Sequence, residues 1–122
     1  MEKVFQMELK KVYPLLVAKA EKKGRTREEV DQVTCWLTGY SREELTALVE
    51  SDITYGEFFR SAPTPNPSRK LITGSVCGVR VETIEDPLIQ EIRYLDKLVD
   101  ELAKGRAVEK VLRNEHRNAR KG

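Results

Sequence analysis

One segment of the chain, residues 86–105, predicts a long helix together with both of its ends. Asp86 is suited to cap the first turn, and Pro87 follows where a missing backbone donor costs nothing. Apolar residues then recur at spacings of four and three, at Leu88, Ile92, Leu95, Val99 and Leu102, with Ile89 and Leu98 widening the stripe. Gly105 ends the pattern because glycine readily adopts the left-handed conformation that closes a helix. A stripe this regular must be buried against the rest of the chain or against a second copy of it.

The first half of the chain predicts four more helices before Ala62. One follows from the helical spacing of apolar residues between Leu9 and Ala20, in which Pro14 either kinks the helix or marks its start. The others follow from N-terminal capping sequences at residues 26–29, 41–44 and 54–57, where a serine or threonine precedes a glutamate by three positions.

The segment after the proline-rich connector, residues 62–68, is ambiguous. Residues 79–84 alternate in the manner of a strand, and residues 3–7 could pair with them, but Ile72, Val76, Val79 and Thr83 also match helical spacing. The sequence therefore predicts a mainly α fold, α+β at most, with a small β element near residues 3–7 and 78–84. An all-α fold is the alternative.

Length and charge predict one domain over residues 1–112 and a basic tail over 113–122. The chain has 122 residues and a formal net charge of +2; the tail carries +3 and the remaining residues −1, so the body is close to neutral. A neutral body gives no general electrostatic argument for nucleic-acid binding. The N-terminus contains no signal or membrane-spanning pattern, and we expect a cytoplasmic protein whose two cysteines, Cys35 and Cys77, stay reduced.

Several runs resemble the bacterial domain of unknown function family 2200. They are AEKKGRT at residues 20–26, WLTGY at 36–40, ITG and CGVRVE within 72–82, and IEDP with IRYLDKLVDELAKG within 84–105. Family members often begin with a histidine-containing stretch, whereas this chain has Glu2-Lys3-Val4-Phe5 there. The resemblance implies a small bacterial protein and carries no assigned activity, so no catalytic residue transfers from it.

The residues themselves indicate no catalytic site, metal site or cofactor. The single histidine, His116, lies in the polar tail, where nothing would orient it as a general base or metal ligand. The candidate for a ligand site is a charged group that contains Arg80, Glu82, Arg93 and Asp96, and two of its arginines could bind a small anion. The alternative is an ion-pair network that fixes the strand against the long helix.

Three functional hypotheses follow. The first is a non-enzymatic interaction module, self-associating through the apolar stripe of residues 86–105. The second is a small-anion binder or an enzyme that uses Arg80, Glu82 and Arg93. The third, nucleic-acid binding through the helices and the basic tail, is disfavoured because the candidate recognition helix over residues 42–50 is acidic. No membrane partner is expected.

Overall fold

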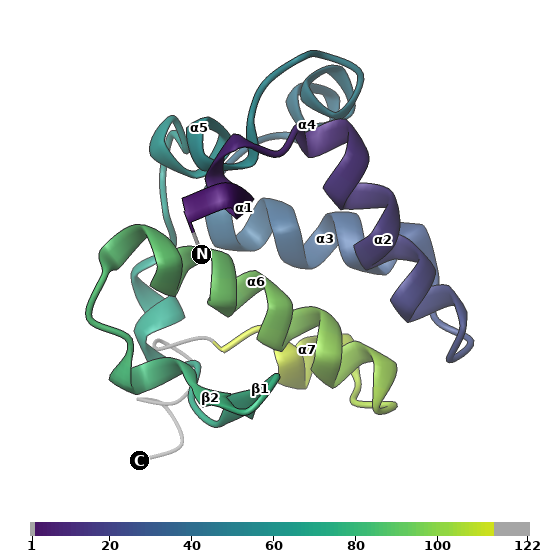
Figure 1. Cartoon of the computed structure of the whole chain (residues 1–122). Coiled ribbons are helices and arrows are strands. Elements are labelled where there is room, and N and C mark those ends of the chain that lie inside the picture. The colour runs from purple at the N-terminus through teal and green to yellow at the C-terminus, as the bar shows by residue number, and fades with distance from the viewer. Residues whose placement is uncertain (1, 114–122) are drawn as a thin grey trace.

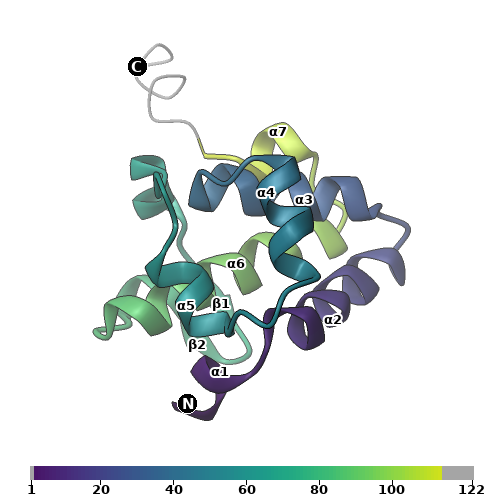
Figure 2. The same cartoon turned by 90° about the horizontal axis from the view of Figure 1, so that it is seen from above.

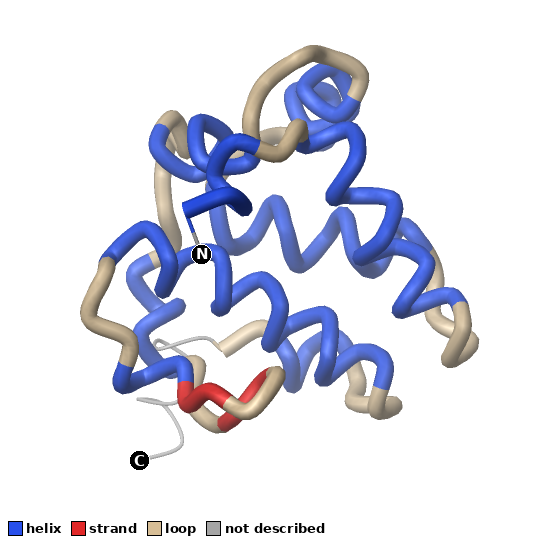
Figure 3. Tube along the Cα trace, viewed as in Figure 1, coloured by secondary structure: helices blue, strands red, loops and turns tan. Residues whose placement is uncertain are grey.

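A computed structural model describes residues 2–113 of the chain (Figure 1). Its elements are α1 (Glu2–Gln6), α2 (Leu9–Glu21), α3 (Arg27–Thr38), α4 (Arg42–Val49), α5 (Tyr55–Arg60), the 3-10 helix η1 (Pro67–Leu71), β1 (Ser75–Val76), β2 (Val79–Arg80), the 3-10 helix η2 (Val81–Thr83), α6 (Pro87–Ala103) and α7 (Val108–Val111). Helices dominate, and the strands form only a small hairpin (Figure 3). The predicted mainly α fold with a minor β element is confirmed.

The long helix α6 runs through the centre of the molecule. It packs against α2, α3 and α5, and also against β1, η2 and α7 (Figures 1 and 2). Asp86 caps it as predicted, with its Oδ1 accepting hydrogen bonds from the backbone N–H groups of Leu88 and Ile89 at 2.9 and 3.1 Å. The five central positions of the stripe are buried, namely Ile92, Leu95, Leu98, Val99 and Leu102. The centre of the stripe is therefore covered by the rest of the same chain, while Leu88 and Ile89 at its start are half-buried.

The predicted N-terminal caps of the earlier helices are also present. At α3 the Thr26 hydroxyl accepts from the Glu29 N–H at 3.2 Å, while the Glu29 carboxylate accepts from the Thr26 N–H at 3.0 Å. Ser41 and Glu44 make the same reciprocal pair of bonds at α4. The helix α2 begins at Leu9 and includes Pro14, so the proline does not mark its start.

The predicted pairing of residues 3–7 with residues 78–84 is wrong. Residues 2–6 form α1, and the strand β2 pairs instead with β1, Ser75 opposite Arg80 and Val76 opposite Val79. Positive φ angles at Cys77 (52°) and Gly78 (79°) make the tight two-residue turn that closes such a hairpin. A hairpin closes a much shorter loop than pairing with residues 3–7 would, and its entropic cost is lower. The alternation after Arg80 does not continue as a strand, because η2 begins at Val81.

The proline-rich connector is held against the end of α3. The Thr64 N–H donates to the carbonyl of Thr38 at 3.1 Å, and the Asn66 N–H donates to that of Leu37 at 3.0 Å. Gly39, which ends α3 with a φ of 85°, packs so closely against Thr64 that there is no room for a side chain at position 39. Of the predicted tail, only Arg113 lies within the described residues.

Candidate functional site

Two of the predicted site residues, Arg80 and Glu82, pair with each other at the hairpin. The Nε and Nη2 atoms of Arg80 donate to Glu82 Oε2 at 3.0 and 2.8 Å. The other carboxylate oxygen of Glu82 accepts from the Gly74 N–H at 2.9 Å. The Gly74 amide, together with Arg80, holds the pKa of Glu82 below its usual value. Glu82 therefore ties the two ends of the hairpin together, whereas the alternative left open by the sequence was an ion-pair network that fixes the strand against the long helix.

The other two predicted residues, Arg93 and Asp96, form a second pair on α6. Arg93 Nη1 donates to Asp96 Oδ2 at 3.3 Å, and burial raises the pKa of Asp96. Asp96 lies within electrostatic reach of Lys19 on α2 and of the buried Tyr55 on α5. The hairpin and η2 contact α6 elsewhere, through Gln90 and Lys97. The four predicted residues thus form two ion pairs, one at the hairpin and one on α6.

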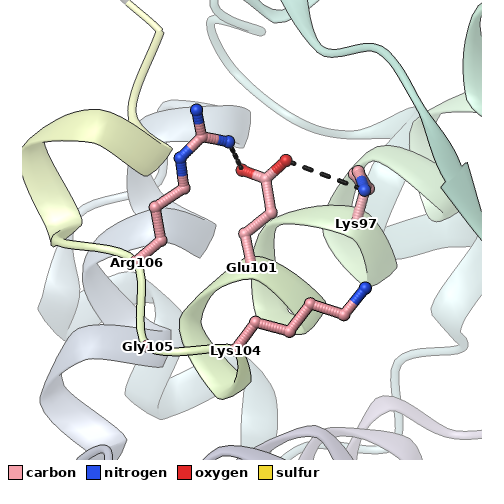
Figure 4. Close-up of a pocket in the computed structure, with 5 residues that line it drawn as sticks. All are labelled: Lys97, Glu101, Lys104, Gly105 and Arg106. Carbon is pink, nitrogen blue, oxygen red and sulfur yellow. Dashed lines mark ion pairs between the residues drawn. The ribbon is translucent and has the colours of Figure 1, made fainter.

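A different charged cluster surrounds Glu101 near the end of α6. Glu101 is only 5% exposed, and three cationic side chains pair with its carboxylate. Lys97 Nζ lies 3.8 Å from its Oε2, and Arg106 Nη1 lies 3.3 Å from its Oε1. Figure 4 shows these two cations on either side of the carboxylate. Arg113 adds a two-pronged contact, with its Nη2 donating to Oε2 at 2.6 Å.

Lys97, Glu101 and Arg106 of this cluster line an open depression with a volume of about 370 Å³. Lys104 and Gly105 complete its wall beside Lys97, Glu101 and Arg106 (Figure 4). Lys104 pairs with Asp100 at 3.1 Å, yet its side chain remains 70% exposed, and that of Arg106 is 48% exposed. The volume falls within the range of small-molecule sites. We refer below to this depression as the basic pocket.

The way in which α6 ends explains the position of the cations. Gly105 has a φ of 93° and turns the chain back, so that the Arg106 N–H donates to the carbonyl of Glu101 at 3.1 Å. This reversal places Arg106 beside the Glu101 side chain, while Lys97 lies one helical turn before it. Cations are favoured there because the C-terminus of a helix carries a partial negative charge.

Sequence analysis did not identify the basic pocket. Lys97 and Glu101 have the spacing of an ordinary surface pair on a helix, and nothing in that spacing indicates that the carboxylate is buried. The available signal was the concentration of Lys104, Arg106 and Arg113 after the helix. Arg113 was instead grouped with the tail, although its side chain is mostly buried against Glu101.

The described residues give no sign of a metal site or a membrane span. Within residues 2–113, no group of three or more His, Cys, Asp or Glu side chains could hold a metal ion. No helix in this range is long and apolar enough to cross a membrane. His116 lies outside the described residues, and Cys35 and Cys77 are free thiols.

Comparison with known proteins agrees with the resemblance seen in the sequence. A model of the family DUF2200, described as an uncharacterized protein conserved in bacteria, matches residues 3–113. The chain belongs to this family. The crystal structure of the uncharacterized protein SP1917 is similar over 92% of this chain and 92% of its own, with 54% sequence identity and a TM-score of 0.89. No curated protein matches the chain. Neither comparison brings an activity, so a function must be argued from the chemistry of the site.

Proposed function

We propose that this protein is a non-enzymatic binding module that takes a small oxyanion, of the phosphate type, in the basic pocket. The observation that supports this most strongly is the imbalance of charge around Glu101. Lys97, Arg106 and Arg113 all reach this one carboxylate, and Lys104 lines the same wall. Asp100 offsets part of the charge of Lys104, and the cations still outnumber the carboxylates.

Burial makes this imbalance costly for the empty protein. The side chains of Lys97 and Arg113 are only 12% and 13% exposed, so water screens their charges poorly. A bound oxyanion would offset the excess positive charge, and the exposed side chains of Lys104 and Arg106 would reach it by loosening their pairs with Asp100 and Glu101. Charge-assisted hydrogen bonds to such an anion are the strong kind.

The predicted arginines are less suited to this role. Arg80 makes two hydrogen bonds to Glu82, and Arg93 is paired with Asp96, so an anion would have to displace an internal carboxylate in each case. Lys104 and Arg106 are also paired, with Asp100 and Glu101, but they line one depression together, so a single anion there could contact both. We also propose that the protein works in the cytoplasm, where Cys35 and Cys77 would remain reduced.

Calorimetric titration with inorganic phosphate and with sulfate tests the proposal. We expect the wild-type protein to bind, and Arg106→Gln or Lys104→Gln to weaken binding at least about tenfold, the equivalent of 1.4 kcal/mol. Lys70→Gln, which removes an exposed lysine on η1 away from the pocket, is the matched control and should bind like the wild type.

Thermal unfolding gives a second readout, because a ligand that binds only the folded state raises its stability. Phosphate should raise the melting temperature of the wild type and of the Lys70→Gln control more than that of Arg106→Gln. Absence of binding by the wild type at low ionic strength would refute the proposal. So would binding that the Arg106 and Lys104 substitutions leave unchanged.

A further inference from the structure

The basic pocket adjoins a second turn built in the same way. The sequence Lys23-Gly24-Arg25 follows α2, and Lys104-Gly105-Arg106 follows α6. Both glycines have positive φ angles, 83° and 93°. In each turn the arginine N–H donates to a carbonyl five residues back, Arg25 to Ala20 at 3.0 Å and Arg106 to Glu101 at 3.1 Å. The two helices therefore end in equivalent turns, each with a lysine before the glycine and an arginine after it.

Arg25 joins the two turns. Its Nη1 donates to the carbonyl of Arg106 at 2.6 Å and to that of Leu102 at 3.0 Å. Its Nε and Nη2 atoms donate to Glu29 at 3.0 and 2.8 Å. The guanidinium is thus fully engaged in holding the turns together and is not available to a ligand. Figures 1 and 2 both show the two turns next to each other at one end of the molecule.

Charged residues follow the contact between α2 and α6 toward the two turns; we refer to the row formed by Lys19, Asp100 and Lys104 as the seam. Lys19 on α2 lies 3.5 Å from Asp100 on α6, and Asp100 lies 3.1 Å from Lys104. Lys23 follows Lys19 by four residues, as Lys104 follows Asp100, so each lysine comes just after the end of its helix, beyond the Lys19–Asp100 pair. The backbone of Lys22 remains helical, with φ −59° and ψ −26°, which carries this row past the end of α2.

The end of the seam therefore lacks a balancing negative charge. Within residues 2–113, no ion pair or hydrogen bond engages the Lys23 side chain, and Lys23 is exposed. Asp100 is shared between Lys19 and Lys104, so it cannot compensate Lys23 as well. Each helix C-terminus contributes only about half a negative charge. A second anionic group beside the basic pocket would compensate the positive charge of Lys23.

We infer that the ligand of the basic pocket carries two linked phosphate groups, one held by Lys104 and Arg106 and the other by Lys23. This inference rests on the proposed function and adds the ligand class to it. Lys23 is not among the residues that line the basic pocket, so a second phosphate group is needed to engage it. The shared chemistry is the pyrophosphate group, which inorganic pyrophosphate and nucleoside diphosphates both contain.

Calorimetric titration of the full chain with phosphate, pyrophosphate and ADP tests this inference. We expect pyrophosphate to bind about tenfold more tightly than phosphate, as one additional charged contact would give. Lys23→Gln should remove that advantage and leave phosphate binding unchanged, whereas Arg106→Gln should weaken both. Lys70→Gln is again the control, and circular dichroism checks that each variant is folded. Tighter binding of ADP than of pyrophosphate would identify a nucleotide as the source, and the reverse would identify free pyrophosphate.

The outcomes separate this inference from the proposed function. Equal affinity for phosphate and pyrophosphate, with both weakened by Arg106→Gln, would overturn the inference and leave the proposed function standing. A pyrophosphate preference that survives Lys23→Gln would overturn it too. Binding of none of the three ligands would overturn both. Tight binding of a short single-stranded oligonucleotide that depends on Lys23, without binding of pyrophosphate, would assign the surface to a nucleic-acid backbone and overturn the inference.

Discussion

Replacing Gly39 with alanine should destabilise the fold by about 2–5 kcal/mol, for two reasons that the structure separates. The first is the φ angle of 85°, which an L-residue adopts at a cost of about 1–2 kcal/mol. The second is steric. A Cβ atom at Gly39 would lie 2.7 Å from the carbonyl oxygen of Thr64 and 2.8 Å from its backbone nitrogen. Because these are backbone atoms, the connector itself must move away from α3.

That movement would weaken the two hydrogen bonds that hold the connector. They run from the Thr64 N–H to the carbonyl of Thr38 and from the Asn66 N–H to that of Leu37. Each such bond contributes about 0.5–1.5 kcal/mol, which adds about 1–3 kcal/mol to the backbone cost. Urea denaturation followed by circular dichroism measures the sum as a shift of the unfolding midpoint.

Gly24→Ala is the matched control for this experiment. Gly24 has nearly the same φ angle, 83°, but a Cβ atom there would meet nothing within 4 Å. It should cost only the backbone term, about 1–2 kcal/mol. Equal losses of unfolding free energy for Gly39→Ala and Gly24→Ala would refute the reasoning, because they would show that the connector can move away from α3 at no cost in free energy.

Three further predictions concern the core and the caps. Leu95→Ala should cost about 2–5 kcal/mol, because Leu95 is fully buried in α6, whereas Leu15→Ala, at a site that is 65% exposed, should change the free energy of unfolding by less than about 0.5 kcal/mol. Equal small effects in urea melts would show that the α6 stripe is not packed. Tyr55→Phe should leave stability unchanged or raise it, because the buried Tyr55 hydroxyl has no hydrogen-bond partner within the described residues; Tyr13→Phe should lower it, because the Tyr13 hydroxyl donates to Asp31 at 2.5 Å. Differential scanning calorimetry of the two variants would contradict this if Tyr55→Phe proved the more damaging. Arg25 lowers the pKa of Glu29 from 4.5 to about 2, so Glu29 stabilises the fold above pH 4.5 and this contribution is lost as the pH falls toward 2. Glu29→Gln should therefore be less stable than the wild type at pH 7, and the difference should shrink in melts at pH 3; a constant difference would argue against it.

Much of the fold could be predicted because helix ends are encoded locally. Asp86 with Pro87, and Thr26 with Glu29, lie within one turn of each other, so their geometry follows from the chain itself. The strand prediction failed beyond Arg80 because alternation of β-branched residues shows a preference for extended backbone but not the identity of a partner. The turn at Cys77 and Gly78 made the neighbouring segment the partner of β2.

The candidate site could not be predicted to the same degree. The sequence indicated the residue types of two ion pairs, Arg80 with Glu82 and Arg93 with Asp96, but it did not show which elements each pair would contact. It also left open whether the apolar stripe of α6 is covered by the chain itself or by a second copy, and in the structure the central positions of the stripe are buried within the chain.

The sequence by itself determined the helices, their caps and the apolar face of α6, because these depend on residues a few positions apart. Only the tertiary structure decided that Glu101 is buried among three cations and that the turns after α2 and α6 meet. Those features bring together Arg25, Glu101 and Arg113, whose separation along the chain leaves no periodic or local signal. Burial and the sharing of charge are consequences of packing, and packing is fixed only when all the helices are in place.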